Sequence, residues 1–306
     1  MRIEAPERSG PAGKALNKTR VFLDAIKFEH TIFALPFAYL GMVLATPASQ
    51  HGWPGFAKLF WITMAMAGAR TVAMGMNRLI DASQDAMNPR TANRALPRKL
   101  LKPGEMLLFT LAASALLIYS AAKLNPLCVK LLPVAAIFLV GYSYTKRFTW
   151  MCHLVLGVTD GIAPAGGWLA VNPTISVSNL VPPLLLGLAV AFWVGGFDLI
   201  YACQDIAFDR AHGLKSVPSR FGPTRALQVS ELAHGASVGL LAAVGAMLHL
   251  GGFFWIGVAA AAWLLIMEHR LVRPDDFSQL GVAFFNINGY IAISVFVFSL
   301  LGVLIR

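Results

Sequence analysis

Apolar stretches recur from near the start of the chain to its end, and short segments that hold most of the charged residues separate them. A helix of about 20 residues is long enough to cross the hydrocarbon core of a bilayer, which is about 30 Å thick. The pattern predicts nine helices, near residues 23–46, 57–80, 106–122, 127–145, 152–171, 180–202, 226–248, 251–269 and 283–305. We therefore expect an all-α polytopic membrane protein, with an N-terminal tail (residues 1–22) followed by one membrane domain (residues 23–306).

The composition supports this interpretation. Of the 306 residues, 57% are hydrophobic and only 13% are charged, whereas a soluble globular domain is typically about 45–50% apolar and about 25% charged. The mean hydropathy is +0.64. Lipid is therefore the expected surrounding of most of the chain.

The net charge of +10 is distributed unevenly. If the N-terminus lies in the cytoplasm, the cytoplasmic segments contain 18 Lys and Arg residues and the opposite segments contain 4, as the positive-inside rule requires. The basicity thus indicates topology, and we expect no nucleic-acid partner. The expected location is the bacterial inner membrane, with the N-terminus and the polar loops in the cytoplasm. A mitochondrial presequence is an alternative interpretation of the basic first 20 residues.

Two groups of acids occur where predicted helices end. In the first, Asn77, Asp81 and Asp85 are spaced by four residues in GMNRLIDASQD, so they share one stripe of a helix surface. In the second, the segment FDLIYACQDIAFDRAHGLKS contains a set of polar residues along a similar stripe: Asp198, Tyr201, Asp205, Asp209 and, further on, Lys215. Acids at such positions are costly in a membrane protein and indicate a functional site, although a single one is often a solvated helix end.

The chemistry of these residues points to magnesium. Facing carboxylate pairs repel each other unless cations lie between them, and oxygen donors at helical spacing suit Mg²⁺ better than zinc or iron. Magnesium commonly binds through one or two carboxylates together with substrate phosphates. The implied ligand is a diphosphate, with Lys and Arg residues of the neighbouring loops on its remaining oxygens.

These motifs resemble those of the UbiA superfamily of intramembrane prenyltransferases, which has NDxxDxxxD in the second helix and DxxxD in the sixth. Asn77, Asp81 and Asp85 match the first motif, although Arg78 stands where many members have an acid, and YACQDIAFDRAHGLKS matches the second. TKRFT is similar to the basic turn between the fourth and fifth helices, and EHRLVRPDDFSQLGVAFFNINGYI is similar to the last loop and helix of the quinone-precursor branch.

The resemblance implies nine transmembrane helices around a central cavity, with a cap formed by two cytoplasmic loops. It also implies the reaction: a polyprenyl diphosphate ionises with the help of Mg²⁺, and an aromatic acid is prenylated on a ring carbon ortho to its hydroxyl group. The acceptor would be 4-hydroxybenzoate in ubiquinone biosynthesis or, as an alternative, a dihydroxynaphthoate-type acid in menaquinone biosynthesis. An apolar cavity would keep water from the carbocation.

Individual roles follow from the same resemblance. The metal ligands would be Asp81, Asp85, Asp205 and Asp209. The substrate-binding residues would be Asn77, Arg94, Lys146, Tyr201 and Lys215, and the residues closest to the chemistry would be Arg147, Asp160 and Asp198. The basic turn could equally reflect topology.

Two further polar features have competing interpretations. Asp160 lies deep in a predicted span, where an acid is functional by default, but it could also pair with a neighbouring helix. The glycines around it, Gly157, Gly161, Gly166 and Gly167, allow close helix packing or form a cavity wall. Lys27, Glu29 and His30 form a polar run that we expect inside the first helix, as an internal ion pair.

A transporter is the competing class of protein. It would place its binding groups near the bilayer midplane, on broken helices. Here the acids gather at one rim of the predicted bundle, which favours the enzyme.

Overall fold

The protein is helical throughout the part that the computed structural model describes, which comprises residues 11–27, 31–47, 49 and 51–305. The main helices are α1 (Pro11–Ala25), α2 (Thr31–Ala45), α3 (Phe56–Ile80), α5 (Pro103–Leu124), α6 (Pro126–Thr145), α7 (Cys152–Val171), α8 (Val177–Ala202), α11 (Pro223–Met247), α12 (Gly252–Leu271) and α13 (Asn288–Leu304). Short helices follow α3 and α8 or precede α11 and α13: α4 (Ala82–Met87), η3 (Cys203–Asp205), α9 (Ile206–Ala211), α10 (Val217–Phe221) and the π-helical η4 (Val282–Ile287).

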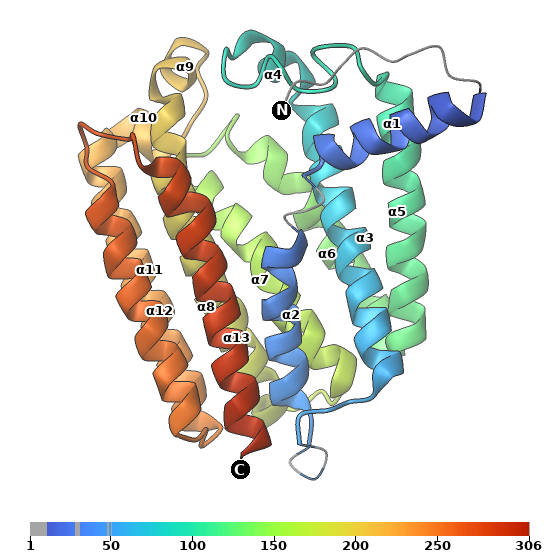
Figure 1. The fold of residues 1–306 in the computed structure, drawn as a ribbon, viewed down its shortest axis with the longest axis vertical. Coiled ribbons are helices and arrows are strands. Elements are labelled where there is room, and N and C mark those ends of the chain that lie inside the picture. Colours follow the sequence, from blue (N-terminus) through green and yellow to red (C-terminus); the bar gives the residue numbers. More distant parts are fainter. Residues whose placement is uncertain (1–10, 28–30, 48, 50, 306) are drawn as a thin grey trace.

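Eight helices of the described chain are long and apolar enough to cross a membrane, and a shorter apolar helix spans Leu35–Ala45. The long helices run side by side as a bundle (Figure 1), in which α7 packs on α8 and α2, α8 on α11, and α3 on α5. The predicted helices from residue 57 onwards are confirmed, with ends that differ by a few residues.

The predicted first helix (residues 23–46) is wrong at its start. The chain forms α1 instead, which lies across one end of the bundle, over α3 and α5 (Figure 1). Phe22 stacks on Phe109 of α5 at 4.5 Å between ring centroids, and Lys18 pairs with Glu105. Part of the predicted tail is therefore helical and fastened to α5.

The turn after α1 explains the error. Lys27 adopts a φ of +52°, which ends the helix, but the apolar pattern continues through this point and gives no sign of the change in direction. Lys27 thus lies outside the helices, contrary to the prediction, and its expected partners Glu29 and His30 lie outside the described residues.

Glycines of α7 allow the helices at the centre of the bundle to touch. A Cβ atom added to Gly157 would lie 2.0 Å from the carbonyl oxygen of Ala191, and one added to Gly167 would lie 2.1 Å from that of Ala38. At Gly166 nothing lies within 4 Å, and this residue lines the central cavity. Both interpretations of the glycine-rich segment are therefore correct: Gly157 packs closely, Gly166 lines the cavity, and Gly167 does both.

The two polar segments predicted to form a cap lie at the same end of the bundle. In Figure 1 α4 and the chain that follows it face α9 and α10 across the top of the bundle. The acids of both motifs are thereby brought to one rim.

Candidate active site

A cavity of about 1090 Å³ occupies the middle of the bundle. It extends from Arg94, in the segment between α4 and α5, to Cys128 at the start of α6. Most of its wall is apolar, and its polar lining includes residues near the rim, namely Asn77, Arg78, Arg90, Arg94, Asp198 and Tyr201, and two in the middle of their helices, Arg70 and Asp160. The space can hold an elongated apolar molecule with a polar end.

The first acidic motif is built at the junction of α3 and α4. Asp81 separates the two helices, and its backbone N–H still donates to the carbonyl of Asn77, at 2.9 Å, so the three motif residues remain on successive turns. The amide of Asn77 donates to the Asp81 carboxylate (2.9 Å) and to Ser143 (3.1 Å). The spacing of four residues thus keeps Asn77 and Asp81 on one stripe, as predicted, and brings their side chains into contact.

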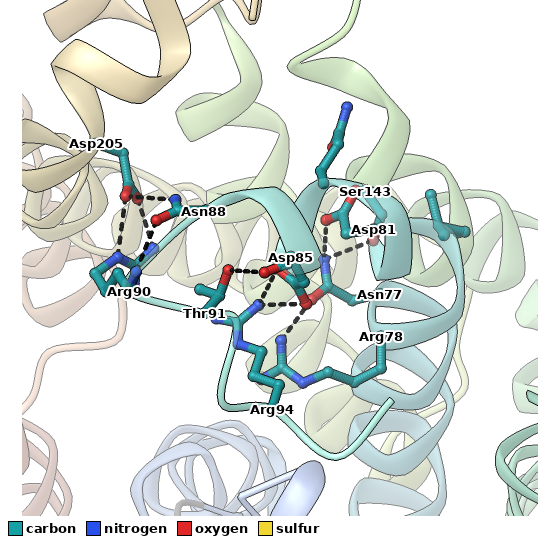
Figure 2. Close-up of polar contacts among 12 residues, drawn as sticks. Asn77, Arg78, Asp81, Asp85, Asn88, Arg90, Thr91, Arg94, Ser143 and Asp205 are labelled. Atoms are coloured by element: carbon teal, nitrogen blue, oxygen red, sulfur yellow. Dashed lines mark hydrogen bonds and ion pairs between the residues drawn. The ribbon is translucent and has the colours of Figure 1, made fainter. Parts of the chain in front are cut away.

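Basic side chains hold the acids of this motif (Figure 2). Arg94 donates to both carboxylate oxygens of Asp85, at 2.6 and 2.8 Å. Arg147 lies 3.0 Å from one oxygen of Asp81, and the Lys146 ammonium lies 3.7 Å from the other. The basic turn after α6 therefore meets the first motif, a contact that the sequence did not predict.

The second motif meets the first through the segment after α4. Arg90 donates to both oxygens of Asp205, with the shorter contact at 2.5 Å, and Asn88 donates to the same carboxylate at 3.0 Å (Figure 2). Arg90 also donates to the hydroxyl group of Tyr201 (3.1 Å). These bonds connect the two acidic groups, which are more than 100 residues apart in the chain.

The other residues of the second motif have different surroundings. Asp209 accepts a hydrogen bond from Ser216 (2.9 Å). The ammonium group of Lys215 donates to the carbonyl of Phe148 (3.2 Å), outside the cavity lining. The helix changes to a 3-10 turn at Cys203–Asp205, so Asp198 does not continue the stripe of the later acids.

Asp198 faces the cavity and is held by a residue that the sequence pattern did not indicate. The Nδ1 atom of His153 lies 2.6 Å from the Asp198 carboxylate, and its Nε2 accepts from the backbone N–H of Val217 (3.4 Å). Because Nε2 accepts, the proton is on Nδ1 and is donated to Asp198. The spacing of charged residues along the chain could not reveal His153, because this residue lies on α7, 45 residues before Asp198.

Burial affects the first motif directly. Asp81 is only 4% exposed, and burial raises its pKa above the ordinary value, while Lys146 and Arg147 act in the opposite direction. A cation at this carboxylate would favour its charged form.

The residues present fit magnesium and diphosphate in donor type. Within the described ranges, no three His, Cys, Asp or Glu side chains are grouped so that they could hold a metal ion on their own. Magnesium does not require such a cage, because it keeps waters and takes phosphate oxygens alongside one or two carboxylates. Carboxylate pairs and an amide at one rim, surrounded by arginines, meet that requirement.

The bundle and its cavity define a polytopic membrane protein with a polar site at one end of an apolar chamber. The model of the UbiA prenyltransferase family matches residues 34–290, and the chain belongs to this family. It is accordingly a prenyltransferase and an integral membrane protein. The transporter considered from the sequence is thereby set aside.

Curated relatives cover most of the chain. A 4-hydroxybenzoate octaprenyltransferase of Aliivibrio fischeri is 30% identical over 267 residues, which are 84% of this chain and 88% of the relative. The enzyme of the same name from Thiobacillus denitrificans is 29% identical over 259 residues, which are 84% of this chain and 86% of the relative.

Solved structures share the fold. The apo structure of a UbiA homologue from Aeropyrum pernix K1 is 33% identical with a TM-score of 0.79, and the match covers 89% of this chain and 97% of that one. A UbiA homologue from Archaeoglobus fulgidus bound to GPP and Mg²⁺ has a TM-score of 0.69 at 18% identity, over 91% of this chain and 99% of that one.

Proposed function

We propose that the protein transfers a polyprenyl group from a polyprenyl diphosphate to 4-hydroxybenzoate, ortho to the hydroxyl group, in a magnesium-dependent reaction of ubiquinone biosynthesis. The observation that carries this proposal is the position of two acidic motifs and their arginines at the polar rim of a large apolar cavity. The names of the curated relatives support the acceptor, and the Archaeoglobus fulgidus homologue bound to GPP and Mg²⁺ supports the donor and the metal.

The proposed metal ligands are the four acids of the motifs, with Asn77 helping: Asp81, Asp85, Asp205 and Asp209. Bound magnesium would withdraw charge from the diphosphate and so favour its departure. Three basic side chains now pair with these acids: Arg90, Arg94 and Lys146. If the acids bound a cation, these side chains would be free to donate hydrogen bonds to the phosphate oxygens instead. Lys215 would need to turn away from Phe148 to join them.

The acceptor is proposed to lie deeper in the cavity, against Arg70 and Asp160. Both side chains line the cavity, and the Nε atom of Arg70 is buried with no hydrogen-bond partner among the described residues. A buried donor without a partner is costly, and the carboxylate of an aromatic acid would satisfy it. Asp198, held by His153, is the proposed acceptor of the proton that the ring loses.

Product analysis tests the proposed reaction. The purified protein in lipid is given magnesium, a mixed set of polyprenyl diphosphates and either 4-hydroxybenzoate or a dihydroxynaphthoate-type acid, and the products are identified by mass spectrometry. We expect a prenylated 4-hydroxybenzoate and its loss when magnesium is chelated. If only the dihydroxynaphthoate-type acid were prenylated, it would replace 4-hydroxybenzoate as the proposed acceptor. If no prenylated product formed, the proposed function would be overturned.

We also propose that the rim with both motifs faces the cytoplasm, as the charge bias requires. Cysteines introduced at Ser83 and Ala211, which are both exposed, into a chain without its native cysteines should be labelled by an impermeant reagent from the same, cytoplasmic side. Labelling of the two positions from opposite sides would contradict the topology. Ser216 is unsuitable for this experiment because it is buried against Asp209.

His153 offers a test of the proposed proton acceptor. His153→Leu removes the donor to Asp198 and should lower turnover by roughly tenfold, with little change in the KM of either substrate, because a positioned base loses its orientation. His153→Asn keeps an N–H near the position of Nδ1 and should recover part of the rate. His212→Leu, at an exposed histidine, is the control. A variant that only melts earlier would show that the pair supports the fold alone.

A further inference from the structure

Arg78 is the residue at which this chain departs from the first motif, and its surroundings are unusual for a cation. It belongs to the last turn of α3 and is only 8% exposed. It nevertheless lines the cavity, next to Asn77 and Arg94. A positive charge therefore lies at the border between the protein interior and the proposed diphosphate position.

The hydrogen bonds of Arg78 all go to neutral oxygens. Its Nε donates to the backbone carbonyl of Ala25, at 3.0 Å, and its Nη1 donates to the side-chain carbonyl of Asn77, at 3.1 Å. Within the described ranges no ion pair includes Arg78. A guanidinium has five N–H donors, so most of those of Arg78 remain available.

The nearest acids are already paired. Asp85 is held by Arg94, and Asp81 by the basic turn of Lys146 and Arg147. With Arg90 on Asp205, four cations pair with three acids at this rim, and Arg78 adds a fifth positive charge. Burying a charge without a counter-ion is costly, so the site as built has a place for an anion.

We propose that Arg78 is a direct ligand of the diphosphate, in which its free N–H groups donate to non-bridging phosphate oxygens. The planar guanidinium matches two oxygens of a phosphate at once. This proposal rests on the proposed prenyl diphosphate substrate. Arg78 thus brings a positive charge to the diphosphate directly. An acid at this position could do so only by binding a cation.

The position of Arg78 beside Arg94 suits this role. Figure 2 shows both side chains reaching towards the group formed by Asn77 and Asp85 from the same side. If Asp85 held the proposed cation, Arg94 would be freed beside Arg78, and the two guanidinium groups could together bind the diphosphate.

A structural role is the competing explanation, because the bond to Ala25 also fastens the end of α1 to α3. The two roles differ in what happens without magnesium. A ligand of the diphosphate contributes to its binding even when no metal is present, whereas a fastener of α1 does not.

Binding of inorganic pyrophosphate to the purified full-length protein, measured by calorimetry in the presence of a chelator and again with magnesium, separates these roles. We expect Arg78→Gln to weaken metal-free binding by about tenfold or more, the effect of losing charge-assisted hydrogen bonds. Arg78→Lys should bind with intermediate affinity, because it keeps the charge but loses the fork. Arg78→Asp should bind pyrophosphate only with magnesium.

Two controls match the charge change. Arg98→Gln removes an exposed cation from the segment between α4 and α5, outside the cavity lining. Lys18→Gln loosens α1 by breaking its pair with Glu105. Both should bind pyrophosphate like the unaltered protein. If Arg78→Gln binds as these controls do and only melts earlier, Arg78 fastens α1 and the proposal is overturned. If the unaltered protein binds no pyrophosphate even with magnesium, the proposed substrate itself fails.

Discussion

Replacing Asp81 or Asp205 with asparagine should reduce prenyl transfer by a factor on the order of 100 to 1000 while the protein remains folded and inserted. Each change removes a charge proposed to hold magnesium, whose stabilisation of the leaving group is worth several kcal/mol. The fold should survive because both acids lie in connections at the rim, where their partners Arg147 and Arg90 are about a third exposed. Turnover at saturating magnesium is the measurement, and melting temperature reports the fold.

The control for this pair is Asp275→Asn, which removes an exposed acid from the connection between α12 and α13. It should leave turnover unchanged. Near-normal activity of Asp81→Asn or Asp205→Asn would remove these residues from the metal site.

Asp160→Asn should impair use of the aromatic acid and spare the diphosphate. The substitution keeps the shape of the side chain but removes its charge opposite Arg70, so the KM of the acid should rise or the turnover number should fall by roughly 10- to 100-fold. The KM of the prenyl diphosphate should change little, because Asp160 belongs to α7 and is not one of the acids proposed to hold the metal.

The competing role of Asp160, a partner for a neighbouring helix, predicts a different result. Such contacts are worth only about 0.6–2 kcal/mol in membranes, so the variant would melt earlier with both kinetic constants preserved. Glu231→Gln, at an exposed acid of α11, controls for the loss of charge. A variant that melts earlier but turns over normally would exclude Asp160 from the acceptor site.

The fold was largely predictable because lipid imposes a simple requirement on length and polarity. The helices from α3 onwards follow this requirement, and their ends were predicted to within a few residues. The failure at α1 has a physical cause: Phe22 and Ile26 are apolar because they pack on the protein at the end of the bundle, in a cluster with Leu101 and Met106. Apolar residues that face protein and those that face lipid look alike in a sequence.

The site was predictable only where its residues share a helix. The four-residue spacing of Asn77 and Asp81 corresponds to a real hydrogen bond, since successive turns fix that distance. The contacts of Arg90 with Asp205 and of His153 with Asp198 join segments distant in the chain. They depend on the path of a connection and on the packing of α7 against α8, which no local pattern specifies.

The arginines that pair with the acids have a consequence for the charge balance of the site. Carboxylates gathered at one rim would repel each other, but Arg94 on Asp85 and Arg90 on Asp205 balance their charges. On the proposed function, magnesium and the diphosphate would exchange one counter-ion of the acids for another, as in an ion exchanger, and the displaced arginines would then lie beside phosphate oxygens. If the proposed function holds, the charges of the site would be balanced both before and after the metal and the diphosphate bind.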